Sequence, residues 1–477
     1  MVRATFSGFN TALSALQANQ KRLDITGQNL SNMNTAGYTR QQLEASSLNY
    51  TNPVSHYSNG NETAVGFGVS MDRVSQIRDP YLDIQYRSQS ADCSYTNRLQ
   101  TALNSLSKVL DETTISGIRK AFDDVQSTLT SMQDPAKVSD PIYESELRTK
   151  MQSVCNLFNQ ASRQITQAEQ NEFQRLTGEG SSEQGDVQKI NDILRQIGDL
   201  NVQIKRNQVA GHPSLELQDE RNLLLDELSG YIPVETRYYK DDAHSGNNAY
   251  DYDANGAVIG KKDWPDDLEV SMNYIDAQGK SQKLILVNGS DLGADGLTKN
   301  YGQLSVLNRD HQPAASVSDP TNISIKFEKA PSYQGNGQAA TDVYAELKGI
   351  HFEGGSLQAS LDMLQKKGTG NVINGSVDDV RGYQYYSEKL DQLADTFAKS
   401  MNASNNGNNH KDQNLLSNST DDSTNGITAG NIGISKGWTS GTIHISTDGT
   451  NRTDTILDMI AAMKDTKKLN GKHLLII

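Results

Sequence analysis

Apolar residues recur at alternating spacings of three and four along the first thirty residues, as at the a and d positions of a coiled coil. An isolated helix of this length is only marginally stable in water, so its apolar stripe needs a partner to cover it. The pattern predicts a helix over residues 1–30 that enters a coiled coil, with packing on its own domain as the alternative. We call its large apolar side chains the N-terminal seam: Phe6, Phe9, Leu13, Leu16, Leu23 and Leu30.

Three later segments carry the same periodicity, which predicts long helices in an antiparallel bundle. Gly and Ser residues at 177–185 separate two of these helices, and Asp186 is placed to cap the second. A further short helix is predicted at 454–463. The predicted buried positions are Leu147, Met151, Val154, Phe158, Ala161, Ile165 and Ala168; Val187, Ile190, Leu194, Ile197 and Ile204; and Tyr386, Leu390, Leu393, Phe397 and Met401.

The periodicity changes between residues 238 and 351, where short alternating runs at 268–275, 282–287 and 322–329 are separated by Gly, Asp, Asn and Pro. These are strand and turn signals. Because helical patterns flank the block on both sides, we expect a β-rich domain inserted into a helical one. The fold class is therefore mixed α and β, mostly α: a rod of long helices with coiled-coil character and an inserted β-rich domain.

Composition restricts the partners of the chain. With Gly counted in place of Tyr, only about two fifths of the residues are apolar, against roughly 45–50% in ordinary globular chains, which favours an elongated shape. The net charge of −14 argues against a nucleic-acid or anionic-membrane partner. No run of eighteen apolar residues occurs, so no membrane-spanning helix is expected. Cys93 and Cys155 are expected to be buried free thiols rather than a bridge.

Motifs for catalysis, cofactors or metals are weak throughout. The eight histidines show no paired spacing, and each is expected at the surface rather than as a ligand. Asp251, Asp253, Asn255 and Gly256 match the start of a calcium loop, but Lys262 occupies the position of the closing Glu. The same stretch suits a β-hairpin with an Asn-Gly turn, which we favour. We therefore expect no enzyme activity, no catalytic residue, no cofactor and no metal.

The segment SGFNTALSALQANQKRLDITGQNLSNMNTAGYTRQ, residues 7–41, resembles the N-terminal signature of the axial proteins of the bacterial flagellum. Its ending, with Tyr38, Arg40 and Gln41, is similar to the hook-associated protein 1 family, which forms the junction between hook and filament. Three further blocks, at 66–87, 217–235 and 354–365, resemble that family in the same order. The core of the signature is matched by Asn29, Asn32, Asn34, Thr35, Gly37 and Tyr38.

The resemblance implies a domain division that agrees with the predicted seams. Residues 1–36 would line the inner tube as a coiled coil, and 37–237 with 352–405 would form a helical bundle. Residues 238–351 would form the outward β-rich domain, and 406–477 a C-terminal segment. We expect the closing helix of the family, which pairs with the N-terminal seam, to be missing at the end of this segment.

The resemblance also implies partners and a location. Each subunit would bind identical neighbours head to tail in an open helical array, together with hook protein and a second hook-associated junction protein. Export without a cleaved signal peptide, through the flagellar export apparatus and with a chaperone, would place the protein in the extracellular flagellum. The alternatives are another axial protein of rod, hook or filament end, or a secreted enzyme or adhesin carried by the β-rich domain.

The Asn-rich turn after the first helix is the predicted contact site. Asn and Ser side chains can bond the last helical carbonyls or a neighbouring subunit. Gly37 is expected to turn the chain through a positive φ, Tyr38 to anchor it, and Arg40 to contact a neighbour. A purely intramolecular cap is the alternative.

Overall fold

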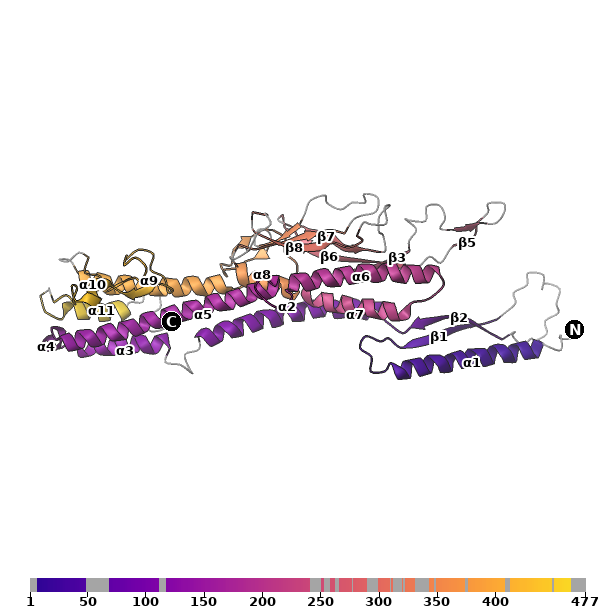
Figure 1. The fold of residues 1–477 in the computed structure, drawn as a ribbon, viewed down its shortest axis with the longest axis horizontal. Helices are drawn as coiled ribbons and strands as arrows, with labels where there is room; N and C mark the ends of the chain where they lie inside the picture. The colour runs from indigo at the N-terminus through magenta and orange to yellow at the C-terminus, as the bar shows by residue number, and fades with distance from the viewer. Residues whose placement is uncertain are drawn as a thin grey trace.

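The chain forms an elongated rod of long helices, with small sheets along one side (Figure 1). The structure is a computed structural model of the 477-residue chain. The residues that it describes are 7–48, 68–110, 117–240, 250–252, 258–261, 266–276, 278–289, 299–308, 310–311, 320, 322–330, 343–346, 349–373, 376–407, 412–447 and 450–464. The elongated shape expected from the composition is confirmed.

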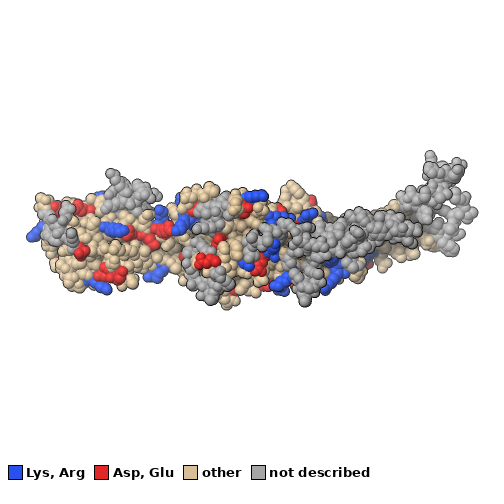
Figure 2. Space-filling view, turned by 90° about the horizontal axis from the view of Figure 1, so that it is seen from above, with Lys and Arg blue, Asp and Glu red and all other residues tan. Residues whose placement is uncertain are grey.

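Helices supply most of the rod (Figure 1). Figure 2 shows that both signs of charge occur along the described length of one face. The helices are α1 (Ser7–Ser31), α2 (Pro80–Leu110), α3 (Ile118–Ser131), α4 (Pro135–Val138), α5 (Pro141–Thr177), α6 (Asp186–Val209), α7 (Leu215–Tyr231), α8 (Ser356–Gln365), α9 (Tyr383–Asn406), α10 (Lys436–Ser440) and α11 (Asp454–Lys464).

The longest helix, α5, shows how local sequence sets its ends. The Asp140 side chain accepts a hydrogen bond from the amide of Ile142 at 2.9 Å, and Pro141 occupies the first helical position. Gly178 ends the helix with φ +76° and donates its amide to the carbonyl of Gln174 at 2.7 Å. The predicted seam of this helix is buried, with Ala168 partly buried.

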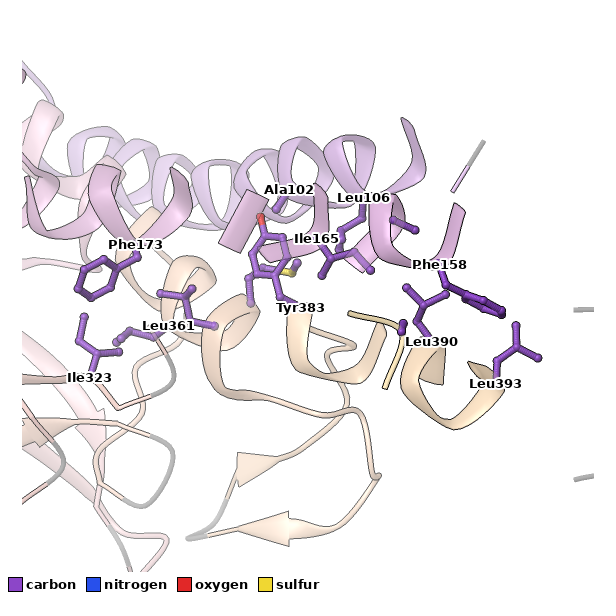
Figure 3. Packing of buried hydrophobic residues seen from close by; sticks show 14 of the residues in the cluster. Ala102, Leu106, Phe158, Ile165, Phe173, Ile323, Leu361, Tyr383, Leu390 and Leu393 are labelled. Atoms are coloured by element: carbon purple, nitrogen blue, oxygen red, sulfur yellow. The ribbon is translucent and has the colours of Figure 1, made fainter. Parts of the chain in front are cut away.

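The predicted seams of α6 and α9 are also buried, except that Tyr386 is partly exposed, so the three bundle seams are confirmed. The core that they form includes Phe122, whose ring packs edge-on against Phe158 and Phe397, with centroids 5.9 and 5.0 Å away. Figure 3 shows this core from close by, with Phe158 of α5 beside Leu390 of α9.

A buried charge network also ties the helices together. The carboxylate of Glu172 on α5 pairs with Arg98 of α2 and, at 3.3 Å, with Arg175. Arg175 in turn pairs with Asp186 of α6 at 2.7 Å and donates to Ser360 of α8 at 2.8 Å. Burial, followed by the neighbouring Arg175, lowers the pKa of Arg98 to about 10. Removing one member would leave a buried charge without its partner, which is far costlier than losing a surface pair.

The described residues of the β-rich block form two three-stranded sheets and a hairpin. The strand orders are β3–β6–β7 and β10–β9–β8, all antiparallel. The three predicted strands correspond to β6, β7 and β9 and are confirmed. The strands are β3 (Glu235–Lys240), β4 (Tyr250–Tyr252), β5 (Val258–Lys261), β6 (Asp266–Ile275), β7 (Ser281–Asn288), β8 (Gln303–Leu307), β9 (Ser324–Glu328) and β10 (Val343–Ala345).

The hairpin favoured over the calcium loop is confirmed, because β4 and β5 pair antiparallel. Asp253, Asn255 and Gly256 lie outside the described residues. In the described part of the chain, no group of three or more His, Cys, Asp or Glu could hold a metal ion. None of the described helices is long and apolar enough to cross a bilayer.

Asparagines on α6 hold the sheets against the bundle. Asn191 exchanges two hydrogen bonds with the backbone of Leu304 on β8, at 2.8 and 2.7 Å. The amide of Asn201 donates to the carbonyls of Leu268 and Gly289, at 3.1 and 3.0 Å. Asn201 interrupts the apolar seam of α6 because its buried side chain must satisfy sheet carbonyls.

The C-terminal segment packs back on the bundle as a hairpin and two helices. Strands β13 (Leu416–Asn418) and β14 (Ile432–Ile434) pair antiparallel. The predicted helix at 454–463 is confirmed as α11, which packs against α9 and α3. The expectation of a missing closing helix concerns residues after Lys464, which lie outside the described residues.

Three expectations about single residues are wrong. Gly185 is the N-terminal cap of α6, and Asp186 pairs with Arg175 instead of capping the helix. Cys93 is exposed, because its position on α2 faces away from the core, whereas Cys155 is buried and burial raises its pKa to about 12. His351 was expected at the surface but is buried at the junction of the sheets and the bundle. The other described histidines, His212, His311 and His444, are exposed as expected.

Candidate functional site

Helix α1 lies at one end of the rod and packs on a hairpin of strands β1 (Gln41–Ser47) and β2 (Val69–Gln76) (Figure 1). Its face toward the hairpin buries Ala18 and Ile25. The hydroxyl oxygen of Ser14 accepts a hydrogen bond from the amide of Val69 at 3.3 Å. The hairpin itself is not predicted from the sequence, because its strands contain few apolar residues and are separated by a long connection.

The N-terminal seam lies on the opposite face of α1. At 100° per residue, Leu13, Leu16 and Leu23 lie about 120° to 180° from Ala18 and Ile25. Five seam side chains are described, and they are between 54% and 72% exposed: Phe9, Leu13, Leu16, Leu23 and Leu30. Phe6 lies outside the described residues. Helix α1 therefore presents a row of large apolar side chains to the outside of the subunit.

The turn after α1 is held by local hydrogen bonds. The amide side chain of Asn32 donates to the carbonyl of Gln28 at 3.1 Å, and the backbone amide of Thr35 donates to the carbonyl of Asn32 at 3.0 Å. Gly37 has φ +77°, so the predicted left-handed turn is confirmed. Asn34 is exposed.

Asn29 fastens the last turn of α1 to the first residue of β1. Its side-chain carbonyl accepts hydrogen bonds from the amide of Gln41 and the hydroxyl of Tyr38, at 2.9 and 3.0 Å. Its side-chain amide donates to the carbonyl of Gln41 at 2.9 Å. Asn is the residue type that can accept and donate in this geometry at once. These contacts fix the direction in which the chain leaves the helix.

A second set of contacts joins the turn to α7. The amide of Thr39 donates to the Asp219 carboxylate at 3.0 Å, and Gln41 donates to Glu216 at 3.3 Å. Burial raises the pKa of Asp219. Burial, and then the charges of Glu216 and Asp219, raise the pKa of Tyr38. The turn is therefore a bracket between α1, the hairpin and the bundle.

The predicted contact residues of the turn fall into two groups, those that bond within the subunit and those whose side chains are exposed. Asn29, Tyr38 and Gln41, like Asn32 and Thr35, bond within the subunit, as the intramolecular alternative requires. The Arg40 side chain, in contrast, is exposed, as is Asn34. A contact role for these two residues and for the N-terminal seam stays a prediction.

Sequence reasoning missed a second exposed apolar surface, at the start of α2. Tyr81, Leu82, Ile84 and Tyr86 are between 52% and 65% exposed. The signal was present in the sequence, since four large apolar residues within six positions cannot share one buried face of a helix. Arg87 beside them is buried and pairs with Asp226 of α7 at 2.8 Å, which holds this part of α2 on the bundle.

Comparison with known proteins gives two matching family models. The first, described as the flagellar hook-associated protein FlgK helical domain, matches residues 103–416. The second, described as the flagella basal body rod protein, matches residues 9–39, which span α1 and the turn.

Two curated relatives are named flagellar hook-associated protein 1. The chain is 33% identical to flagellar hook-associated protein 1 of Bacillus subtilis over 246 residues, which are 52% of this chain and 46% of that protein. It is 28% identical to the protein of the same name from Salmonella typhimurium over 229 residues, 47% of this chain and 38% of that protein. The chain thus spans less than half the length of these relatives.

The chain is also similar to a solved structure, that of the flagellar hook junction protein FlgK from Burkholderia pseudomallei, with a TM-score of 0.42 and 18% identity. The match covers 71% of this chain and 44% of that one. The helical-domain model alone matches well over half of the present chain. The chain therefore belongs to the family of the flagellar hook-associated protein FlgK helical domain.

Proposed function

We propose that this chain is a structural subunit of the bacterial flagellum that forms the junction between hook and filament. Its family membership, and the name and sequence of its relatives, support this role. The same family argues for a structural rather than an enzymatic function. The helical-domain model matches residues 103–416, whereas the rod-protein model matches only residues 9–39. This difference favours a hook-associated protein over a rod or hook protein.

The exposed N-terminal seam is the observation that carries the proposal. Large apolar side chains on one helix face normally find a partner, because leaving them in water forgoes roughly 25 cal/mol per Å² of apolar surface. The opposite face of α1 is occupied by the hairpin, so a second helix can pack on the exposed leucines of the seam, which are Leu13, Leu16, Leu23 and Leu30. In an open helical array the partner comes from a neighbouring subunit or another axial protein.

In this proposal the bracket sets the angle of α1, and Arg40 and Asn34 contact neighbours. A planar, multi-donor guanidinium at an exposed position suits carbonyl or carboxylate groups of an adjacent subunit. We also propose the division into a tube-lining helix (1–36), a helical bundle (37–237 and 352–405), an outward β-rich domain (238–351) and a C-terminal segment (406–477).

The partners are proposed from the same family role. They are further copies of this chain, hook protein, a second hook-associated junction protein, and the export apparatus with its chaperone. The protein would leave the cell through the flagellar export channel and reside in the extracellular flagellum.

The chain should be sought where the junction forms. We would express it, with an epitope in the β-rich domain, in a flagellated bacterium from which hook-associated protein 1 has been deleted, and image isolated hooks by immunogold electron microscopy. Gold at the distal end of the hook is expected. Gold along the rod or the whole hook would indicate another axial role, and the absence of gold from isolated hooks would contradict the proposal.

A further inference from the structure

A cavity of about 560 Å³ lies where the β-rich block meets α2 and α8, away from α1 (Figure 1). Its walls include Asp92 and Tyr95 of α2, Asp362 of α8, Lys366 directly after α8, and His351 and Glu353 on the segment that leads from the sheets into α8. We call it the His351 cavity.

The polar side chains on the α8 side of the His351 cavity hydrogen-bond to one another. One carboxylate oxygen of Asp362 accepts from the hydroxyl of Tyr95 at 2.8 Å, and the other accepts from the side-chain amide of Gln358 at 2.7 Å. Lys366 pairs with Asp362 at 3.2 Å and donates to the carbonyl of Val377 at 3.2 Å. These groups satisfy one another and require no ligand.

His351 is different, because its imidazole is buried without a partner. His351 is only 7% exposed, and neither nitrogen of its imidazole ring has a hydrogen-bond partner. Its backbone is fixed, since it exchanges hydrogen bonds with the backbone of Ile275 at 2.7 and 3.1 Å. A buried polar group without a partner costs roughly 1–3 kcal/mol, so the unpartnered imidazole marks a place where a ligand group would be stabilised.

The imidazole also lines a second, enclosed void of about 10 Å³, shared with Glu346. One carboxylate oxygen of Glu346 is likewise buried without a hydrogen bond. A void of this size has room for one water, which can accept from the imidazole N–H and donate to the Glu346 oxygen. The other ring nitrogen would then be left to accept a hydrogen bond.

The charge of the cavity determines which kind of ligand group the accepting nitrogen of His351 would bind. Four carboxylates line the cavity, those of Asp92, Glu353, Asp362 and Asp379. Lys366 pairs with Asp362 at 3.2 Å and with Asp379 at 3.6 Å, so the lining has an excess of three negative charges. Burial lowers the pKa of His351, so the imidazole stays neutral near pH 7 and can accept a hydrogen bond. A cationic N–H donor fits both features, whereas an anion fits neither.

We propose that the His351 cavity binds an ammonium or guanidinium group, which donates a hydrogen bond to the imidazole and is held by the surrounding carboxylates. A divalent metal is disfavoured, because no three potential ligands among the described residues converge on one point. The cation can be a free amine or a Lys or Arg side chain of a second copy of this chain, and the experiment below separates the two.

The test uses methylguanidinium chloride and its neutral analogue methylurea on the full chain. The imidazole resonances of His351, assigned with His351→Gln, are followed by NMR during titration near pH 7.5. Methylguanidinium is expected to shift them with saturation at millimolar concentration, and methylurea is expected to leave them unchanged. No saturable shift with methylguanidinium, or equal shifts with both compounds, would overturn the proposal.

A matched pair of variants tests the carboxylates. Asp92→Asn with Glu353→Gln removes two exposed charges from the cavity, and Asp123→Asn with Glu220→Gln removes two exposed charges elsewhere on the helices. The first pair should weaken binding about fivefold for each carboxylate removed, and the control pair should not change it. Equal affinities in the two double variants would overturn the assignment.

Sedimentation velocity then identifies the source of the cation. If a basic side chain of a second copy occupies the cavity, methylguanidinium and the Asp92→Asn, Glu353→Gln variant will both weaken self-association, whereas the control variant will not. If a free amine is the occupant, self-association will be the same in all samples while the NMR titration still saturates. Either result supports a cation site.

Discussion

At the scale of single residues, Asn29 does more than end a helix. The sequence predicts an Asn-rich cap, and the contacts show that one side chain makes three hydrogen bonds, two to Gln41 at the start of β1 and one to Tyr38 in the turn. Periodicity could not reveal this, because the partners Tyr38 and Gln41 become neighbours of Asn29 only after Gly37 has reversed the chain. Tyr38 bonds within the subunit, as its expected anchoring role requires, and the contact of the exposed Arg40 with a neighbour stays a prediction.

Replacing Asn29 by Ala tests the bracket. The loss of three partly buried hydrogen bonds should weaken the junction of α1 and β1 by about 1–3 kcal/mol. Amide hydrogen exchange at Gln41, whose N–H donates to Asn29, should therefore accelerate by one to two orders of magnitude, at about 1.4 kcal/mol for each factor of ten. Asn34→Ala is the control, since Asn34 is exposed. Equal exchange in both variants would show that Asn29 does not fasten the strand.

His351 should make the stability of the fold depend on pH. Burial lowers its pKa in the folded state, and Lys366 adds to this, although Asp362 acts in the opposite direction. Between the folded pKa and the unfolded value of about 6.5, the unfolded chain binds more protons, so the free energy of unfolding falls as pH falls through this window. Below the folded pKa this contribution is fully lost and the slope ends.

Thermal unfolding of the parent and His351→Gln proteins measures this effect. As pH is lowered from about 7.5 to 5, the parent should lose more stability than the variant, which has no imidazole to protonate. Midpoints that fall in parallel across this range would contradict the assignment of a lowered pKa to His351.

At the scale of elements, the helices of the bundle were predictable and the hairpin beneath α1 was not. Val154 and Phe158 belong to a regular row that is buried from Leu147 to Ile165, so the heptad spacing reports the fold directly. Strands β1 and β2 leave most of their side chains exposed or half-exposed, and their pairing joins Gln41 to Gln76 across a long connection. Local patterns carry little information about such a pairing.

The α5–α6 turn offers a matched test of packing against backbone conformation. Gly178 and Gly180 both have φ +76°, so Ala at either position should cost about 1 kcal/mol for the left-handed conformation. A Cβ on Gly178 would also lie 2.7 Å from the backbone nitrogen of Gly185, whereas one on Gly180 would meet nothing closer than 3.4 Å.

Gly178→Ala should therefore destabilise the chain by about 1–3 kcal/mol more than Gly180→Ala, because the start of α6 must move. Urea unfolding of the two variants gives the comparison. Equal losses would mean that the close approach of Gly185 places no constraint on the turn.

At the scale of the whole molecule, the two ends of the rod differ in how far their apolar helix faces are covered (Figure 1). At one end α3, α9 and α11 bury their apolar faces against one another. At the other end α1 packs one face on a hairpin and leaves the N-terminal seam exposed. The seam and its spacing were predictable from the sequence, but the opposite, buried face was not, because Ala18 and Ile25 do not stand out among the small and apolar residues of the helix.

The central claim is that the N-terminal seam assembles subunits, and paired substitutions on α1 test it most directly. Leu13→Asp with Leu23→Asp places two charges on the seam, whereas Gln17→Asp with Gln28→Asp places two charges on exposed positions beside it. Circular dichroism should show the same helix content for both, since all four side chains are exposed.

The measurement is the amount of each variant in isolated hooks from the deletion strain, relative to the amount exported. The seam variant should fall at least tenfold below the parent, because charged residues at a and d positions prevent helix pairing, and the flanking control should remain near the parent. Equal incorporation of the two variants would contradict the claim that this seam holds the subunit in the flagellum.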